Sequence, residues 1–131
     1  MKNISYILLI TVCFLFNSCK ETFANEEDVQ MITPEEVESL SKMDEVQTLD
    51  VLTSKEYKEE HLKNAQNIVY DENFSHKIQE IDKSKPIIVY CNTKVENEKS
   101  IQILKDSGFV KVYDLKEGIS EWKLKENKTE K

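Results

Sequence analysis

The chain has 131 residues, of which 39% are hydrophobic and 33% charged, and its formal net charge is −7. This length allows one domain and is too short for two. The acidic balance repels phosphate backbones and no run of basic residues stands out, so nucleic acid is excluded as an expected partner.

The first 18 residues have the pattern of an export signal. A single lysine precedes an apolar stretch at 4–16, which is shorter than the roughly 20 apolar residues of a membrane span. Ser18 directly before Cys19 resembles the cleavage site of a bacterial lipoprotein, in which the cysteine thiol carries the lipid. Simple secretion with an incidental Cys19 and an uncleaved anchor remain open alternatives.

This pattern predicts a division of the chain into four parts. Residues 1–18 are expected to be a lipoprotein signal peptide, and residues 19–30 a lipidated acidic tether that begins at Cys19. The folded domain is expected at 31–126, followed by a charged tail at 127–131. The predicted location is exported, lipid-anchored to a bacterial membrane on its periplasmic or surface side.

Strand and helix patterns alternate along the body of the chain. In chain order they are a strand at 29–32, a helix beginning at 33–36, a strand at 46–51, a helix capped by Ser54, a strand at 67–70, a helical face of Phe74, Ile78 and Ile81, a strand at 87–90, a helix with Ile101 and Leu104 that ends before Gly108, a strand at 110–115, and a helix with Ile119, Trp122 and Leu124. This order predicts an α/β fold with a small parallel sheet of about five strands, flanked by helices on both faces.

Two of these segments carry the clearest local signals. Thr33 and Glu36 form a capping box around Pro34, which favours a helix start. The run at 87–90 is the most apolar of the body, so it is the predicted central parallel strand. Gly108 is expected in the left-handed conformation that ends a helix.

Cys91 directly follows the predicted central strand and precedes a helix. Ligands of parallel α/β sheets bind at the carboxyl ends of the strands, where backbone N–H groups can face an anion or a thiolate. Cys91 is therefore a candidate nucleophile. The alternative is that Cys91 acts only as a small apolar residue that covers the end of the sheet, because free cysteines are often simply buried.

The stretch from Thr33 to Trp122 resembles a single rhodanese domain. The segments that carry the resemblance are Leu49-Asp50-Val51, Glu56-Tyr57, Glu60-His61-Leu62, Ala65-Gln66-Asn67-Ile68, Ile88-Val89-Tyr90-Cys91, Ile103-Leu104-Lys105, Gly108-Phe109, Val112-Tyr113-Asp114-Leu115, Gly118-Ile119 and Trp122. Each match is short, but their order along the whole domain makes the predicted fold specific.

The resemblance implies sulfur transfer through a persulfide on Cys91. The residues that would surround it are Asn92, Thr93, Lys94, Val95, Glu96 and Asn97. The donor would be a small molecule such as thiosulfate and the acceptor a thiol, with no cofactor and no metal, and the protein is expected to be a monomer. Asp50 either supports this loop or caps the turn that follows its own strand.

The candidate loop departs from the pattern of active family members. Lys94, Glu96 and Asn97 stand where those members have Gly, Arg and Ser. A carboxylate opposes both a thiolate and an anionic donor, although Lys94 and Lys99 could offset Glu96 and Glu98. The sequence therefore leaves a catalytically inactive binding module as the first alternative to an enzyme, and a thiol redox sensor as a distant third.

The remaining distinctive side chains have structural interpretations. His61 is expected to pack or bond locally, and His76 to lie on a solvated helix face. Trp122 is expected in the core, because it lies on an apolar helix face.

Overall fold

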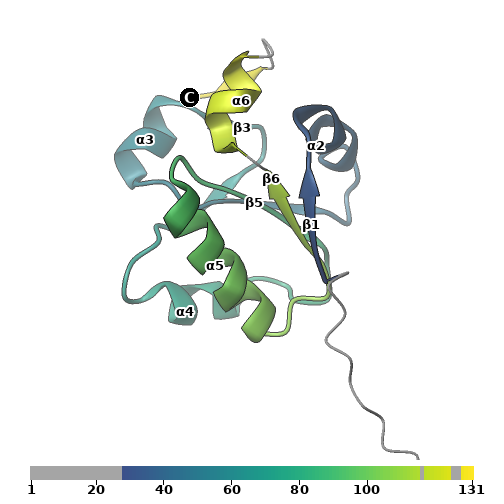
Figure 1. Ribbon diagram of the computed structural model, residues 1–131, viewed down its shortest axis with the longest axis vertical. Helices are drawn as coiled ribbons and strands as arrows, with labels where there is room; N and C mark the ends of the chain where they lie inside the picture. The colour runs from purple at the N-terminus through teal and green to yellow at the C-terminus, as the bar shows by residue number, and fades with distance from the viewer. Residues whose placement is uncertain (1–27, 116, 125–127) are drawn as a thin grey trace, which may run out of the picture.

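A computed structural model describes residues 28–115, 117–124 and 128–131 of the chain (Figure 1). Its elements in chain order are β1 (Val29–Ile32), α2 (Pro34–Leu40), β2 (Gln47–Asp50), α3 (Ser54–Glu59), β3 (His61–Leu62), β4 (Gln66–Asn67), α4 (Phe74–Lys77), the 3-10 helix η3 (Ile78–Glu80), β5 (Ile87–Tyr90), α5 (Lys94–Asp106), β6 (Val112–Leu115), α6 (Gly118–Leu124) and β7 (Thr129–Glu130). Apart from the short strand β3, strands and helices alternate as expected for the α/β class.

Five strands form one sheet in the order β1-β6-β5-β2-β4, and every pairing in it is parallel. β5 lies at the centre, and all four of its residues are at most 1% exposed. Its continuous apolar run is therefore explained by burial on both faces, and the prediction of a central parallel strand is confirmed.

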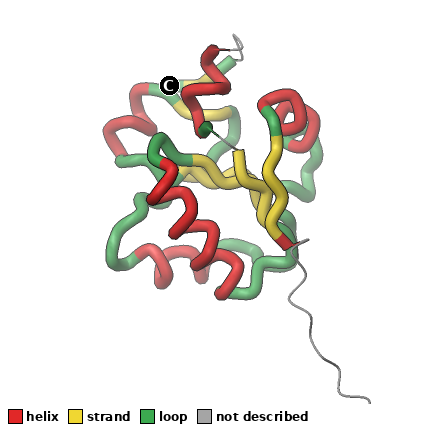
Figure 2. Tube along the Cα trace, viewed as in Figure 1, coloured by secondary structure: helices red, strands yellow, loops and turns green. Residues whose placement is uncertain are grey.

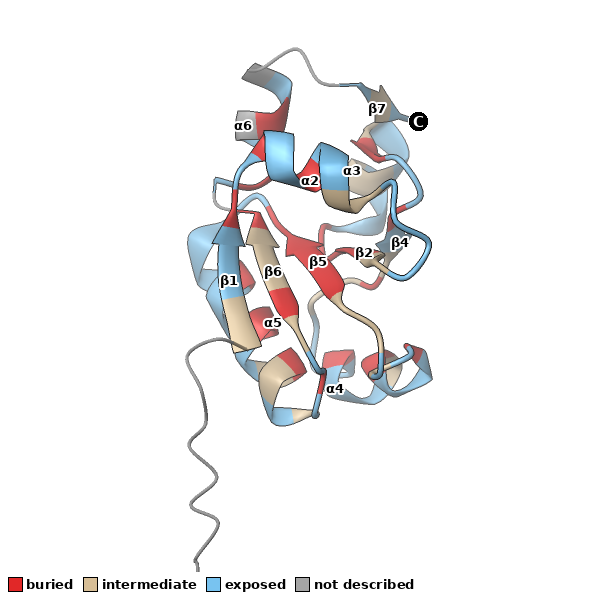
Figure 3. Cartoon of the chain, turned by 90° about the vertical axis from the view of Figure 1, so that its right-hand side faces the viewer, coloured by how far each residue is buried: buried red, intermediate tan, exposed pale blue. Residues whose placement is uncertain are grey.

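Helices lie on both sides of this sheet, as the sequence predicted. α4 and α5 are on one side, and α2 and α6 are on the other (Figures 2 and 3). Both layers contribute buried side chains, among them Phe74 of α4 and Leu104 of α5 from one layer and Val37 of α2 and Trp122 of α6 from the other. The central strand is therefore sealed by both layers, and only its ends reach loops.

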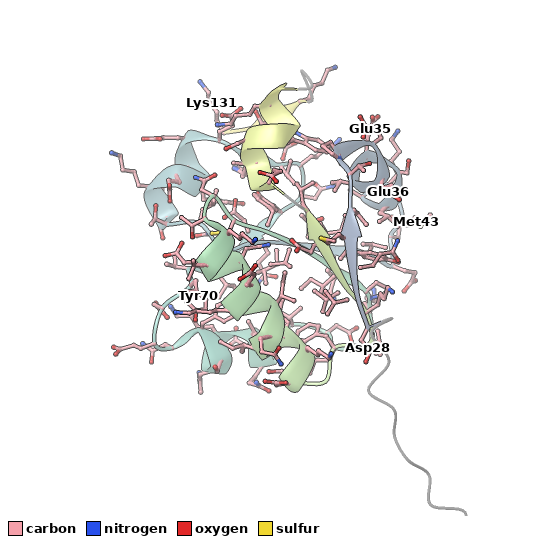
Figure 4. All side chains as sticks on the ribbon, viewed as in Figure 1. Asp28, Glu35, Glu36, Met43, Tyr70 and Lys131 are labelled. Atoms are coloured by element: carbon pink, nitrogen blue, oxygen red, sulfur yellow. The ribbon has the colours of Figure 1, made fainter. Side chains whose placement is uncertain are left out.

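The helix starts follow capping chemistry. Thr33 and Glu36 form the predicted capping box of α2, whose first turn carries Glu35 and Glu36 (Figure 4). The predicted cap of α3 is wrong by one residue, because Thr53 and not Ser54 is the N-cap. Thr53 has Glu56 three residues later and so completes a reciprocal box, whereas Ser54 has a tyrosine at that position.

The strand predicted at 67–70 is shorter and earlier than expected. β4 is limited to Gln66–Asn67, because its partner β2 ends at Asp50 and offers no further strand to pair with. Beyond it, single backbone bonds follow the chain after β2, from Ile68 N–H to the Asp50 carbonyl and from Tyr70 N–H to the Val51 carbonyl.

A second, antiparallel ribbon joins β3 to β7, which the sequence patterns did not reveal. His61 pairs with Glu130 and Leu62 with Thr129, so part of the segment assigned to the charged tail adds to the domain. Glu60 bonds both Lys123 of α6 and Thr129 and ties this ribbon to the last helix.

The signal peptide, Cys19 and most of the predicted tether lie outside the described residues. Among the residues that are described, no helix is both long and apolar enough to cross a bilayer.

Candidate active site

Cys91 is the first residue after β5, at the carboxyl end of the parallel sheet, and the residue is 4% exposed. Two residues, Asn92 and Thr93, separate it from α5. Thr93 is the N-cap of that helix, and its hydroxyl accepts a bond from the Glu96 N–H group at 3.3 Å. The sulfur therefore occupies the strand-to-helix junction that the sequence indicated.

Opposing influences act on the ionisation of this thiol. Burial raises the pKa of Cys91 most strongly, the N–H groups of Thr93 and Asn92 lower it, and the carboxylate of Glu96 raises it again. The net pKa lies above the ordinary thiol value. The expected inward-facing amides are present, but they do not make the resting sulfur a thiolate, because burial and a neighbouring negative charge outweigh them.

The carboxylate of Glu96 lies directly against the sulfur. The Cys91 S–H group donates to Glu96 Oε2 over 3.6 Å, and the same oxygen accepts a bond from the Thr93 hydroxyl at 2.8 Å. The Thr93 hydroxyl thus bonds both the backbone N–H group and the carboxylate of Glu96. The result is a fixed thiol–carboxylate pair at the start of α5.

The other charged groups of the loop are directed elsewhere. Lys94 is 87% exposed in its side chain and faces Glu98 at 3.7 Å, so the offset expected from Lys94 acts on Glu98. Asn92 donates to Glu56 Oε1 of α3 at 3.1 Å, and Val95 is 59% exposed. Two carboxylates, those of Glu96 and Glu56, therefore bond residues of the Cys91 loop.

Asn97 joins the first turns of α5 to the neighbouring strand. Its amide nitrogen donates to Asp114 Oδ1 of β6 at 2.5 Å, whereas its Oδ1 is buried without a partner among the described residues. Burial also raises the pKa of Asp114. Asn97 therefore fixes α5 to β6. Its side-chain amide nitrogen bonds Asp114 and not the sulfur of Cys91.

Asp50 is fully buried and accepts hydrogen bonds from three groups, one of which belongs to the residue before Cys91. Its carboxylate accepts bonds from the Tyr90 hydroxyl at 2.5 Å, the Leu52 N–H group at 2.8 Å and the Asn67 amide at 3.2 Å. Burial raises the pKa of Asp50 despite these donors. Asp50 thus caps the turn after β2 and also holds Tyr90, the residue immediately before Cys91.

Gly118 is a site residue whose role the sequence reasoning missed. Its φ is +61°, and a Cβ placed on it would lie 1.7 Å from the Cys91 carbonyl oxygen. The start of α6 therefore rests on the backbone of Cys91. A glycine in this late turn was visible in the sequence, but nothing local indicated which loop it contacts.

The other distinctive side chains take structural places. His61 stacks on Tyr57 with ring centroids 3.9 Å apart, and Trp122 is buried in the core. A cavity of about 650 Å³ lies between α2 and α6, but its described lining does not include Cys91. In the described part of the chain, no cluster of three or more His, Cys, Asp or Glu residues could hold a metal ion.

Comparisons with known proteins identify similar chains. A family model described as "Rhodanese-like domain" matches residues 33–125. Thiosulfate sulfurtransferase GlpE of Coxiella burnetii is 34% identical over 88 residues, which cover 64% of this chain and 78% of that protein. The uncharacterized protein YqhL of Bacillus subtilis is 27% identical over 116 residues, covering 88% and 90%. The crystal structure of the Alr3790 protein from Anabaena superposes with a TM-score of 0.70 at 24% identity, covering 76% of this chain and 81% of that one.

Proposed function

Because the chain belongs to the rhodanese-like domain family, we propose that Cys91 carries sulfane sulfur as a persulfide between a sulfur donor and a thiol acceptor. One observation supports this most directly. Sγ lies at the carboxyl end of the central strand, and the N–H groups of Asn92 and Thr93 are directed at it. Such a position suits a nucleophile that must hold a charged adduct for part of its cycle.

In the proposed first half-reaction, Glu96 acts as the proton acceptor. The raised pKa of Cys91 keeps the proton on the sulfur at rest, and Glu96 Oε2 already accepts a hydrogen bond from the S–H group. As Sγ attacks the outer sulfur of the donor, the proton moves to Glu96, the S–S bond of the donor breaks, and its electron pair leaves with the departing group. Cys91 then holds one additional sulfur.

In the second half-reaction, an acceptor thiol attacks the outer sulfur of the Cys91 persulfide. The bond between that sulfur and Sγ breaks, and Sγ takes the electron pair and the proton that the attacking thiol gives up. The N–H groups of Asn92 and Thr93 stabilise the negative charge that appears on Sγ as the bond breaks. The cycle consumes no oxidant and returns the free thiol.

The test is direct observation of the persulfide. The purified domain would be treated with a panel of sulfane-sulfur donors, thiosulfate included, and its intact mass measured. We expect the mass to increase by one sulfur atom, the increase to disappear on addition of a thiol acceptor, and Cys91→Ser to remain unmodified. An unmodified Cys91 with every donor would refute sulfur transfer.

A second candidate function is a binding module that retains the fold without catalysis. The specific observation in its favour is the raised pKa of the Cys91 thiol beside Glu96, which leaves little thiolate at neutral pH. This alternative predicts that Cys91 stays unreactive toward all donors, whereas the domain still binds a partner when Cys91 is replaced by serine.

We also propose that the domain is held outside the cytoplasm by a lipid on Cys19. Support comes from the apolar stretch at 4–16 and the small Ser18 before the cysteine. Expressed as the full chain, the protein should fractionate with membranes, and Cys19→Ala should move it to the soluble fraction. Unchanged partitioning of this variant would exclude the lipid anchor.

A further inference from the structure

The position of one carboxylate constrains which donors can reach the sulfur of Cys91. Glu96 Oε2 lies 3.6 Å from Sγ and is held there by the Thr93 hydroxyl at 2.8 Å. A donor must bring its outer sulfur into contact with Sγ, so the rest of the donor necessarily passes close to this carboxylate. Any negative charge on the donor is repelled at short range.

Among the described residues, little positive charge is bonded to this loop to compensate. The 18 basic residues of the chain are all lysines, so the sequence contains no arginine and no guanidinium that could hold an oxyanion through two bonds. Lys94, in the first turn of α5, is directed to Glu98. Asn92, the residue directly after Cys91, donates to the carboxylate of Glu56 in α3.

Thiosulfate fits this environment poorly. It carries two negative charges, and after it transfers its outer sulfur it departs as sulfite, which also carries negative charge. Both the entering and the leaving species would lie beside Glu96. A hydropersulfide of a small thiol, R–S–S–H, reacts in its uncharged form and departs as a thiol, so neither step places an anion there.

We infer that the Cys91 site takes its sulfur from a hydropersulfide whose carrier is uncharged or cationic, and that it discriminates against thiosulfate. This inference rests on the proposed sulfur transfer and specifies its donor. An ammonium group on the carrier would be attracted by the carboxylates of Glu96 and Glu56, so an aminothiol hydropersulfide suits this loop best.

The transfer balances without another reactant. Sγ of Cys91 forms a bond to the outer sulfur of R–S–S–H, and its proton passes to Glu96. The S–S bond of the donor breaks, the electron pair goes to the inner sulfur, and the proton on Glu96 neutralises the departing thiolate as R–S–H. The products are the Cys91 persulfide and a thiol, and the carboxylate of Glu96 is restored.

Three donors that differ in charge test the inference. The probes are the hydropersulfides of cysteamine, which carries an ammonium group, and of N-acetylcysteine, which carries a carboxylate, together with thiosulfate. The rate at which Cys91 gains one sulfur would be followed by intact mass. We expect the rates to fall in that order, with cysteamine hydropersulfide ahead of thiosulfate by about tenfold or more, since one adjacent charge commonly shifts an ionisation by that factor.

Two variants identify the carboxylate responsible. Glu96→Gln keeps the size of the side chain and removes its charge, so the ratio between the cysteamine and N-acetylcysteine donors should fall toward one. Glu38→Gln removes the same charge from α2, where Glu38 pairs with Lys42 on the surface, and should leave the ratio as it is in the unmodified protein.

The outcomes separate the inference from the function on which it rests. If no donor loads Cys91, sulfur transfer itself is wrong. If all three donors load Cys91 at similar rates, or if thiosulfate loads it fastest, sulfur transfer stands and the charge selection is wrong. A donor ratio that Glu96→Gln leaves unchanged would likewise overturn the inference. The donor series on the unmodified protein decides the matter even if Glu96→Gln does not fold.

Discussion

Gly118→Ala should displace the loop that carries Cys91. An alanine Cβ at this position would lie 1.7 Å from the Cys91 carbonyl oxygen and 2.9 Å from its carbonyl carbon, so the oxygen must retreat to at least 3.0 Å. The φ of +61° adds a conformational cost of about 1–2 kcal/mol for any residue with a side chain. Overpacking against backbone adds about 1–3 kcal/mol, so we expect a loss of about 2–5 kcal/mol in the free energy of unfolding.

Gly108→Ala is the matched control for this variant. Gly108 also has a positive φ, +89°, but among the described residues nothing lies within 4 Å of an added Cβ. Its replacement should therefore cost only the conformational share, about 1–2 kcal/mol. The difference between the two variants measures the contact between α6 and the Cys91 backbone.

The assay is urea-induced unfolding of both variants and of the unmodified protein, together with the rate of Cys91 alkylation in the folded state. Gly118→Ala should unfold at lower urea than Gly108→Ala, and only Gly118→Ala should change the alkylation rate. Equal stability losses with unchanged alkylation would refute the claim that Gly118 positions the cysteine loop.

Three other residues around Cys91 and α6 give predictions that can be checked with single variants. Tyr90→Phe removes the hydroxyl that bonds buried Asp50 and should cost about 1–3 kcal/mol in urea unfolding; an unchanged midpoint would contradict this role. Glu96→Gln removes a charge that raises the pKa of Cys91. Iodoacetamide alkylation of the unmodified protein should therefore reach half of its maximal rate above pH 9.0, the ordinary thiol pKa, and alkylation of the variant should do so at a lower pH. Identical pH profiles would contradict the contact between Glu96 and Cys91. Glu117→Gly should raise thermal stability by about 1 kcal/mol, because Glu117 has a φ of +65°, and a lowered melting temperature would disprove the strain.

Elements with strong local signals could be predicted from the sequence. The uninterrupted apolar run at 87–90 marks a strand that is buried on both faces, and Thr33 with Glu36 marks the start of α2 through bonds within one turn. These features depend on neighbours in the chain, so a single sequence is sufficient to find them.

Features that depend on distant contacts could not be predicted. The pairing of β3 with β7 joins residues 61–62 to 129–130, and neither segment has the pattern of a strand by itself. Asn64, with a φ of 61°, takes a conformation that asparagine tolerates better than most residues, but only the turn that it forms reveals the need for it.

The candidate site divides in the same way. The place of Cys91 could be predicted because it follows directly after the apolar run, and the capping role of Thr93 is a local property. The raised pKa of Cys91 could not be predicted from the sequence, because it depends on how deeply the surrounding fold buries the sulfur. The contact of Gly118 with the Cys91 backbone could not be predicted either, since 26 residues lie between Cys91 and Gly118 in the sequence.

Position and charge are set by different residues at this site, and this separation explains how one fold can keep a cysteine in place while its chemistry changes. Gly118 and the N–H groups of Asn92 and Thr93 act through backbone atoms, so they direct the sulfur whatever side chains the loop carries. Glu96 acts on the sulfur through its side chain, whose carboxylate accepts the bond from the Cys91 S–H group. If Cys91 transfers sulfur as proposed, the side chain that faces the sulfur from the first turn of α5 should therefore select the donor, whereas the fold determines only that a sulfur is presented there.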